Sequence, residues 1–168
     1  GPAEEGGQDE YMMKKNFMVE TAEYVTTKLT QYAQTVVLEK PLKLVKTGLA
    51  LSKFGGSGQL WVEILEDAGG KPGRQLASSD IIQLSEISSK PGYDWVDFSF
   101  ARSPRTLSPG RYWIALGFTG SPILNWFYTY GKTVGPVDGT RYKGVYEEDW
   151  SGALGYEFNY RVVGWSSK

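Results

Sequence analysis

Residues 58–79, GQLWVEILEDAGGKPGRQLASS, contain the pattern that decides the fold: a strand, a glycine-rich turn and a second strand. Leu60, Val62 and Ile64 share one face of the first strand and the residues between them share the other, the period-two alternation of a half-buried strand. The turn at residues 68–73, AGGKPG, combines glycines that accept a positive φ with a proline of fixed φ. The stretch therefore predicts two strands joined by a chain reversal.

The same alternation of strands and turns continues along most of the chain. The expected strands span residues 32–39, 42–53, 59–66, 75–84, 93–101, 111–118, 124–130, 141–147 and 156–163, separated by glycine and proline. No stretch has the amphipathic pattern of a three-turn helix, and no repeat with a period of roughly 20–50 residues is apparent. The sequence predicts an all-β fold, a single jelly-roll-like β-sandwich of two antiparallel sheets.

Apolar stripes on three later strands indicate how the core is built. The inward residues are expected to be Val96, Phe98 and Phe100, then Tyr112, Ile114, Leu116 and Phe118, and finally Tyr156, Phe158, Tyr160 and Val162. Burying one large apolar side chain contributes about 1.5–3 kcal/mol before entropy is counted. A dozen such positions can hold a sandwich together, so replacing Phe158 with alanine is expected to be costly.

The ends of the chain differ from its middle. Residues 1–10 are polar and expected to be flexible, and the Gly-Pro start has the form of a protease-cleavage scar. Residues 11–30 leave a short helix and an edge strand both open, with β-branched residues near their end favouring a strand. Residues 31–164 are expected to form the β-sandwich domain, and residues 165–168 a tail.

Charge and length limit the partners. The chain has 168 residues, which suits one domain, and its 18 basic and 19 acidic residues give a formal net charge of −1. This balance provides no field to gather nucleic acid or an anionic membrane. No apolar run approaches the roughly 20 residues that cross a bilayer, so no membrane span is expected in this segment.

Cysteine and histidine are both absent from the sequence. The first absence excludes disulfides, thiolate nucleophiles and zinc–cysteine sites, and the second excludes serine–histidine–acid catalysis. An enzyme would have to use a carboxylate pair such as Glu63 and Asp97, which nothing local brings together, and the acidic residues 147–149 match no calcium loop. We expect a non-enzymatic domain with no catalytic residues, no metal site and no cofactor.

Several segments together resemble a known kind of module. The strand and turn at residues 60–79, WVDFSF at 95–100, LSPGRYWIAL at 107–116 and WSGA at 150–153 resemble the jelly-roll modules of bacterial secreted and surface proteins, the choice-of-anchor-type or carbohydrate-binding-module-like domains. The resemblance covers roughly residues 31–164. It implies a jelly-roll fold, an extracellular or cell-surface location and a place in a larger multidomain protein. Fold alone does not establish a sugar ligand.

Aromatic residues give the sharpest functional hypothesis. Trp126, Tyr128 and Tyr130 share one face of the expected strand at residues 124–130, and Phe127 lies on the other. If Phe127 faces the core, the three rings line an outer surface where they can stack on sugar rings or a peptide; the alternative is that they fill the core or cap sheet edges. The candidate ligand-binding residues are Trp126, Tyr128, Tyr130, Trp113, Asn125 and Arg141, and Trp95 and Trp61 can join them.

Three function classes follow from these observations. The first is a non-catalytic extracellular binding module that holds a glycan through surface aromatics. The second is a structural or adhesion domain of a larger surface protein, with its aromatics mostly buried and another protein as its partner. The third, a glycoside-acting enzyme with paired carboxylates, is disfavoured by the absence of histidine. Joint exposure of Trp126, Tyr128 and Trp113 distinguishes the first class from the second.

Overall fold

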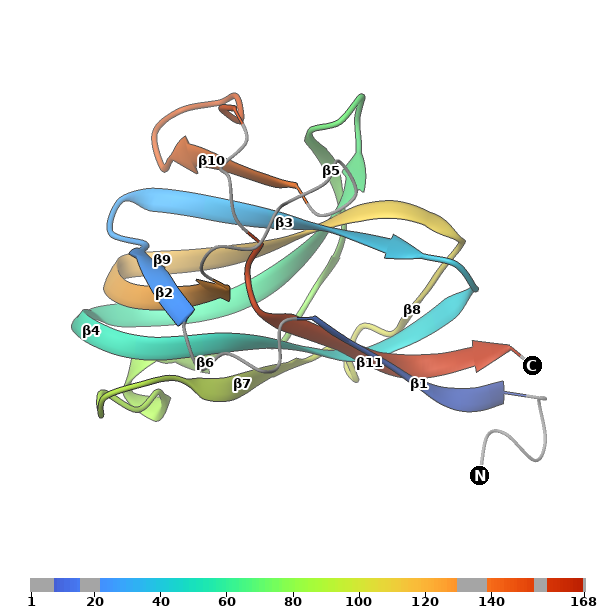
Figure 1. Cartoon of the computed structure of the whole chain (residues 1–168), viewed down its shortest axis with the longest axis horizontal. Helices are drawn as coiled ribbons and strands as arrows, with labels where there is room; N and C mark the ends of the chain where they lie inside the picture. The colour runs from blue at the N-terminus through green and yellow to red at the C-terminus, as the bar shows by residue number, and fades with distance from the viewer. Residues whose placement is uncertain (1–7, 16–21, 130–138, 153–156, 168) are drawn as a thin grey trace.

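The computed structural model describes residues 8–15, 22–129, 139–152 and 157–167 (Figure 1). Most of these residues lie in strands, and the one helix among them is the short 3-10 helix η1 (Leu84–Glu86). Within these ranges no helix has the length and apolar character needed to cross a membrane. The predicted all-β fold class is confirmed.

Hydrogen bonding connects the strands into one curled antiparallel sheet in the order β1-β11-β4-β9-β3-β10, with β2 paired to β9 and β5 to β8 each paired to β4. The strands are β1 (Gln8–Lys15), β2 (Ala22–Thr26), β3 (Thr30–Leu38), β4 (Leu42–Asp67), β5 (Pro72–Ser78), β6 (Ile82–Gln83), β7 (Asp94–Ser99), β8 (Arg105–Leu107), β9 (Gly110–Thr129), β10 (Thr140–Gly144) and β11 (Tyr160–Ser167). β4 and β9 therefore form the centre of the sheet.

Two of the expected turns are not turns. The segments expected as strands at 42–53 and 59–66 form the single strand β4, and those at 111–118 and 124–130 belong to the single strand β9. β4 pairs with β9 from Leu51 to Glu66, across the glycines that suggested a break. The expected strand at 75–84 is instead divided among β5, β6 and η1.

The ends of the chain extend the sheet. In its described part the segment 11–30, for which the sequence leaves helix and strand open, contributes most of β1 and all of β2. β1 begins at Gln8, inside the expected flexible head, and β11 runs to Ser167, inside the expected tail. β1 and β11 lie side by side (Figure 1) and pair along their full lengths. Residues 1–7 lie outside the described part.

Glycines allow the long central ladder to bend. Gly56 has φ 81° and Gly58 has φ 142°, backbone conformations that side chains disfavour. A Cβ at Gly56 would meet the carbonyl oxygen of Ser121, and one at Gly58 would meet that of Thr119. The register also shifts between Lys53 and Gly55, as in a bulge. Figure 1 shows β4 turning back at the left of the view.

One hydrophobic core fills the inside of the curl. It includes residues from both arms of β4, on either side of the glycine bend, together with residues from the later strands. The predicted core residues Phe98, Phe100, Ile114, Leu116, Phe158, Tyr160 and Val162 are all buried, and Val96, Tyr112 and Phe118 pack against them partly buried. Tyr156 lies outside the described residues. The inner face of the sheet thus closes on itself.

The bend predicts a graded response to alanine at three glycines. Gly69 also has a positive φ, but a Cβ there would meet nothing within 4 Å. Gly152 has no positive φ, and a Cβ there would likewise meet nothing within 4 Å. Gly69→Ala should lower the unfolding free energy by about 1–2 kcal/mol, the cost of a left-handed conformation. Gly56→Ala should cost more because the β9 backbone must move, and Gly152→Ala should stay within about 0.5 kcal/mol. Urea unfolding measures the ranking; equal losses at Gly56 and Gly69 would show that close approach does not constrain the bend.

The core predicts a large effect at Phe158. This side chain is fully buried, and its ring stacks on that of Trp126 with the centroids 4.1 Å apart. Phe158→Ala should lower the unfolding free energy by about 3–5 kcal/mol, through lost apolar burial and a cavity. The matched control is Phe54→Ala, whose side chain is 69% exposed and should change stability by less than about 0.5 kcal/mol. Similar losses for the two variants in thermal or urea unfolding would contradict the assigned core.

Candidate functional site

Trp126 lies in the core. Its side chain is fully buried, its ring is stacked on Phe158, and its Nε1 donates to the carbonyl oxygen of Asn159 at 3.2 Å. In the ladder Trp126 pairs with Leu51, which is also buried, so this face of β9 is the inner one. The expectation of an exposed Trp126 ring is therefore wrong, because the strand presents Phe127 outward instead.

Trp113 is on the outer face of β9 but is not exposed. It is 98% buried in a small second cluster with Ala33, Leu65 and Ala115, and Trp150 packs partly buried against this cluster. The indole Nε1 donates to Oδ1 of Asp67 at 2.9 Å. The alternation along the strand gave the correct face, but the expected exposure is wrong because Trp150, far along the chain, covers it.

The remaining candidates are dispersed. Tyr128 is half-buried. Its ring and the core ring of Phe158 lie at a steep angle to each other, with their centroids 6.3 Å apart. Asn125 is nearly buried and its Oδ1 accepts from the Thr26 hydroxyl at 3.0 Å. Arg141, on β10, donates from Nη1 to the carbonyl oxygen of Ser151 at 3.3 Å. Tyr130 lies outside the described residues. Trp126 and Tyr128 share Phe158 as a neighbour, but the five described candidates do not form one surface, and ligand binding by the six stays a prediction.

A different group of aromatic rings lies on the outer face of the sheet. This group, the aromatic row, consists of Tyr24, Phe127, Tyr93 and Trp95. The successive ring centroids are 5.3 Å, 5.4 Å and 6.0 Å apart. Tyr24 is 49% exposed, Tyr93 and Trp95 are half-buried, and Phe127 is buried between its neighbours. The row is therefore a chain of tilted and edge-on ring contacts, of which Tyr24, Tyr93 and Trp95 are partly accessible to solvent.

Sheet pairing brings these rings together from three distant segments. Tyr24 on β2 pairs directly with Phe127 on β9, and Trp95 on β7 pairs with Ala50 on β4. Tyr93 directly precedes β7 and contacts both Phe127 and Trp95. Burial raises the pKa of the Tyr93 phenol above its ordinary value of 10.0, so the hydroxyl stays neutral and can both donate and accept hydrogen bonds at neutral pH.

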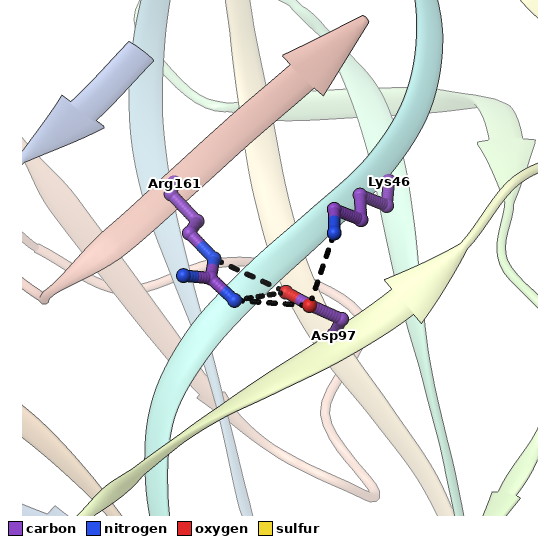
Figure 2. Close-up of polar contacts among 3 residues, drawn as sticks. All are labelled: Lys46, Asp97 and Arg161. Carbon is purple, nitrogen blue, oxygen red and sulfur yellow. Dashed lines mark hydrogen bonds and ion pairs between the residues drawn. The ribbon is translucent and has the colours of Figure 1, made fainter. Parts of the chain in front are cut away.

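An ion-pair group borders the aromatic row at Trp95. The guanidinium carbon of Arg161 lies 5.1 Å from the centre of the Trp95 ring, a cation–π contact. Arg161 also donates to both carboxylate oxygens of Asp97, at 2.8 Å and 2.9 Å from Nη2 and 3.1 Å from Nε. Lys46 Nζ lies 3.3 Å from Asp97 Oδ2. Figure 2 shows the Arg161 and Lys46 side chains pointing to this carboxylate from β11 and β4.

The missing side chain of Gly48 makes room for the Arg161–Asp97 pair. Gly48 on β4 pairs with Arg161 on one side and with Asp97 on the other. A Cβ at Gly48 would lie 2.7 Å from Arg161 Nε and 2.7 Å from Asp97 Oδ1. The guanidinium therefore crosses over the β4 backbone at Gly48 to reach Asp97 on the neighbouring strand.

The aromatic row and the ion-pair group together place apolar rings beside a charged pair. The rings offer flat apolar faces, and the fixed Arg161–Asp97 pair offers directional donors and acceptors at their edge. Within the part of the chain that the structure describes, no group of three or more acidic side chains is placed to hold a metal ion. Sequence alternation identified Trp95 as outward, but Tyr24 could not be found without the pairing of β2 with β9, nor Tyr93 without its contact with Phe127.

The geometry predicts that Gly48→Ala acts through the ion pair. The added methyl group should displace the guanidinium from Asp97 and from the Trp95 ring, changing tryptophan fluorescence and lowering the unfolding free energy. In an Arg161→Gln background the same substitution should cost less, with a coupling of about 0.5–1 kcal/mol, because the pair is partly exposed. Strictly additive losses in this double-mutant cycle would refute the role assigned to Gly48.

Comparison with known proteins adds no family to this description. No protein-family model matches the chain, and no curated protein or solved structure matches it either. The resemblance to choice-of-anchor-type and carbohydrate-binding-module-like domains therefore stays a prediction from the sequence. The candidate site rests on the geometry of the aromatic row and its ion-pair group.

Proposed function

We propose that this chain is a non-catalytic binding module that holds a glycan on the aromatic row. The observation that carries the proposal is the continuity of four rings across β2, β9 and the β7 segment, next to a fixed Arg161–Asp97 pair. A sugar ring presents an apolar face of C–H groups and an edge of hydroxyls. The row would contact the face, and the ion-pair group would hydrogen-bond to the hydroxyls.

The pre-arranged aromatic row and ion-pair group support ligand specificity. Rings that are already packed against each other lose little freedom on binding, so less of the interaction energy goes into ordering them. Arg161 is likewise held by Asp97 and Trp95 before any ligand arrives. A hydroxyl that bonds to this pair must therefore lie at a fixed position relative to the Trp95 ring, which would favour particular sugar stereochemistries.

The fold that we propose for this function is a jelly-roll-like β-sandwich. Support comes from the core, where side chains from both arms of β4 meet in one cluster, as the facing layers of a sandwich do. We further propose that the module is extracellular or at the cell surface and belongs to a larger multidomain protein. These two proposals rest on the resemblance to bacterial surface modules.

A structural or adhesion domain is the second candidate function, and one specific observation favours it. Trp113 and Trp126, the two tryptophans first considered as ligand contacts, are both buried and serve packing. Such a domain would use its outer face against a protein partner. Catalysis is less well supported: Glu63 accepts from Trp61 Nε1 at 2.9 Å, and Asp97 is paired with Arg161, so each carboxylate of the conceivable pair already has a partner.

The proposal predicts that one ring substitution removes glycan binding while the fold persists. On a glycan array, Trp95→Ala should weaken binding of the glycan that the wild-type chain retains. The expected loss is about tenfold or more, which corresponds to about 1.4 kcal/mol of lost stacking. Tyr146→Ala is the matched control, because Tyr146 is 92% exposed and belongs to no described ring contact. Circular dichroism should show unchanged β structure for both variants.

Two outcomes would contradict glycan binding at the row. The wild-type chain could retain no glycan on the array, or Trp95→Ala could bind as tightly as wild type. Either result would favour the structural or adhesion function. Trp126→Ala cannot serve in this test, because the loss of a fully buried ring is expected to destabilise the whole domain.

A further inference from the structure

A second surface feature, separate from the aromatic row, is a cavity of about 230 Å³ beside the bend of β4. One wall comes from β4, where Lys53 and Ser57 line it together with the glycines on either side of Ser57. The other wall comes from Gln83, Leu84 and Ser85, at the junction of β6 and η1. No residue of the aromatic row or of its ion-pair group lines this cavity.

Backbone hydrogen bonds hold the two walls in place. Gln59 on β4 pairs with Gln83 on β6, and the backbone N–H of Lys53 donates to the carbonyl oxygen of Ser88 at 2.9 Å. Gly56 and Gly58 in the β4 wall are fixed by their close approach to β9. The cavity is therefore a formed site rather than a gap between mobile loops.

The lining of the cavity is suited to an anion. Lys53, a partly exposed residue, is the one charged residue of the lining, and no ion pair to it is found in the described part of the chain. Ser57, Ser85 and Gln83 supply hydroxyl and amide donors, and no acidic side chain is among the lining residues. The nearby Glu86 is engaged on its own helix, where its Oε2 accepts from the backbone N–H of Gln83 at 2.6 Å.

We infer that this cavity binds the carboxylate group of a small organic acid, with Lys53 as its counter-ion. One lysine balances one negative charge, whereas a phosphate dianion would bring a second charge without a partner. The volume is below the roughly 300–1,000 Å³ of pockets that hold drug-sized ligands, so it suits a single small group or ring.

The lining residues bear on the charged end of the ligand and leave open what lies beyond the carboxylate. The carboxylate can belong to a free organic acid or to an acidic sugar in a glycan, and Lys53 would be its counter-ion in both cases.

The test is a set of NMR titrations of the full chain with acetate, glucuronate and glucose. Acetate carries only the carboxylate, glucose only the ring, and glucuronate both. The expected result is that acetate and glucuronate shift the backbone amide signals of residues 53–58 and 83–85, whereas glucose does not. Glucuronate binding tighter than acetate would assign an acidic sugar, and equal binding would assign a free acid.

Matched lysine variants identify the counter-ion. Lys53→Met, which keeps an unbranched side chain but removes the charge, should weaken glucuronate binding by about tenfold or more. Lys43→Met, at an exposed lysine on the same strand, should leave it unchanged. Ligand shifts that are confined to other residues, equal shifts with glucose, or unchanged affinity in Lys53→Met would overturn the inference. The wild-type shifts decide the question even if Lys53→Met folds poorly.

Discussion

The antiparallel ladder between β4 and β9 is the interaction on which the rest of the structure depends. These two strands, of 26 and 20 residues, pair continuously through a bend, and most other strands join the sheet by pairing with one of them. Glycines at the bend accept the backbone angles and the close approach of the opposite carbonyls. Because the ladder bends without breaking, the apolar face of a single sheet can enclose its own core.

Small residues have a second role on the outer face, where they let long side chains lie across a strand. Gly48 leaves space for the Arg161–Asp97 pair, and Gly117 leaves space for the Trp61 ring, which is bonded to Glu63. In both cases a planar group covers backbone that would otherwise face solvent. The outer face is thus ordered by cross-strand contacts between its rings and charges.

Much of the fold could be predicted from the sequence, because alternation is a local signal. The pattern around Leu60, Val62 and Ile64 correctly gave a strand with these residues buried, and the stripes that include Phe98 and Phe158 were also correct. The glycines within β4 were misinterpreted as a turn, because a kinked continuous strand and a hairpin loop use the same residues.

The candidate site was less predictable, because it depends on pairing between distant segments. β9 carries aromatic residues on both faces, so only its pairing with Leu51 shows that Trp126 is inside and Phe127 outside. Trp113 was assigned to the correct face, but nothing near it in the sequence indicates that Trp150 covers it. Tyr24 joins the site through the register of β2, which the sequence leaves undetermined.

The pairing of β1 with β11 has a consequence for how the chain acquires its structure. Gln8 pairs with Ser167, so contacts in this part of the sheet join residues from opposite ends of the sequence. Closing such long loops is slow, and proteins dominated by distant contacts fold over milliseconds to seconds rather than microseconds. During synthesis on a ribosome, β1 would emerge before β11 and remain without this neighbour until β11 is complete. Over that interval the charged residues of β1 would limit its pairing with strands of other chains.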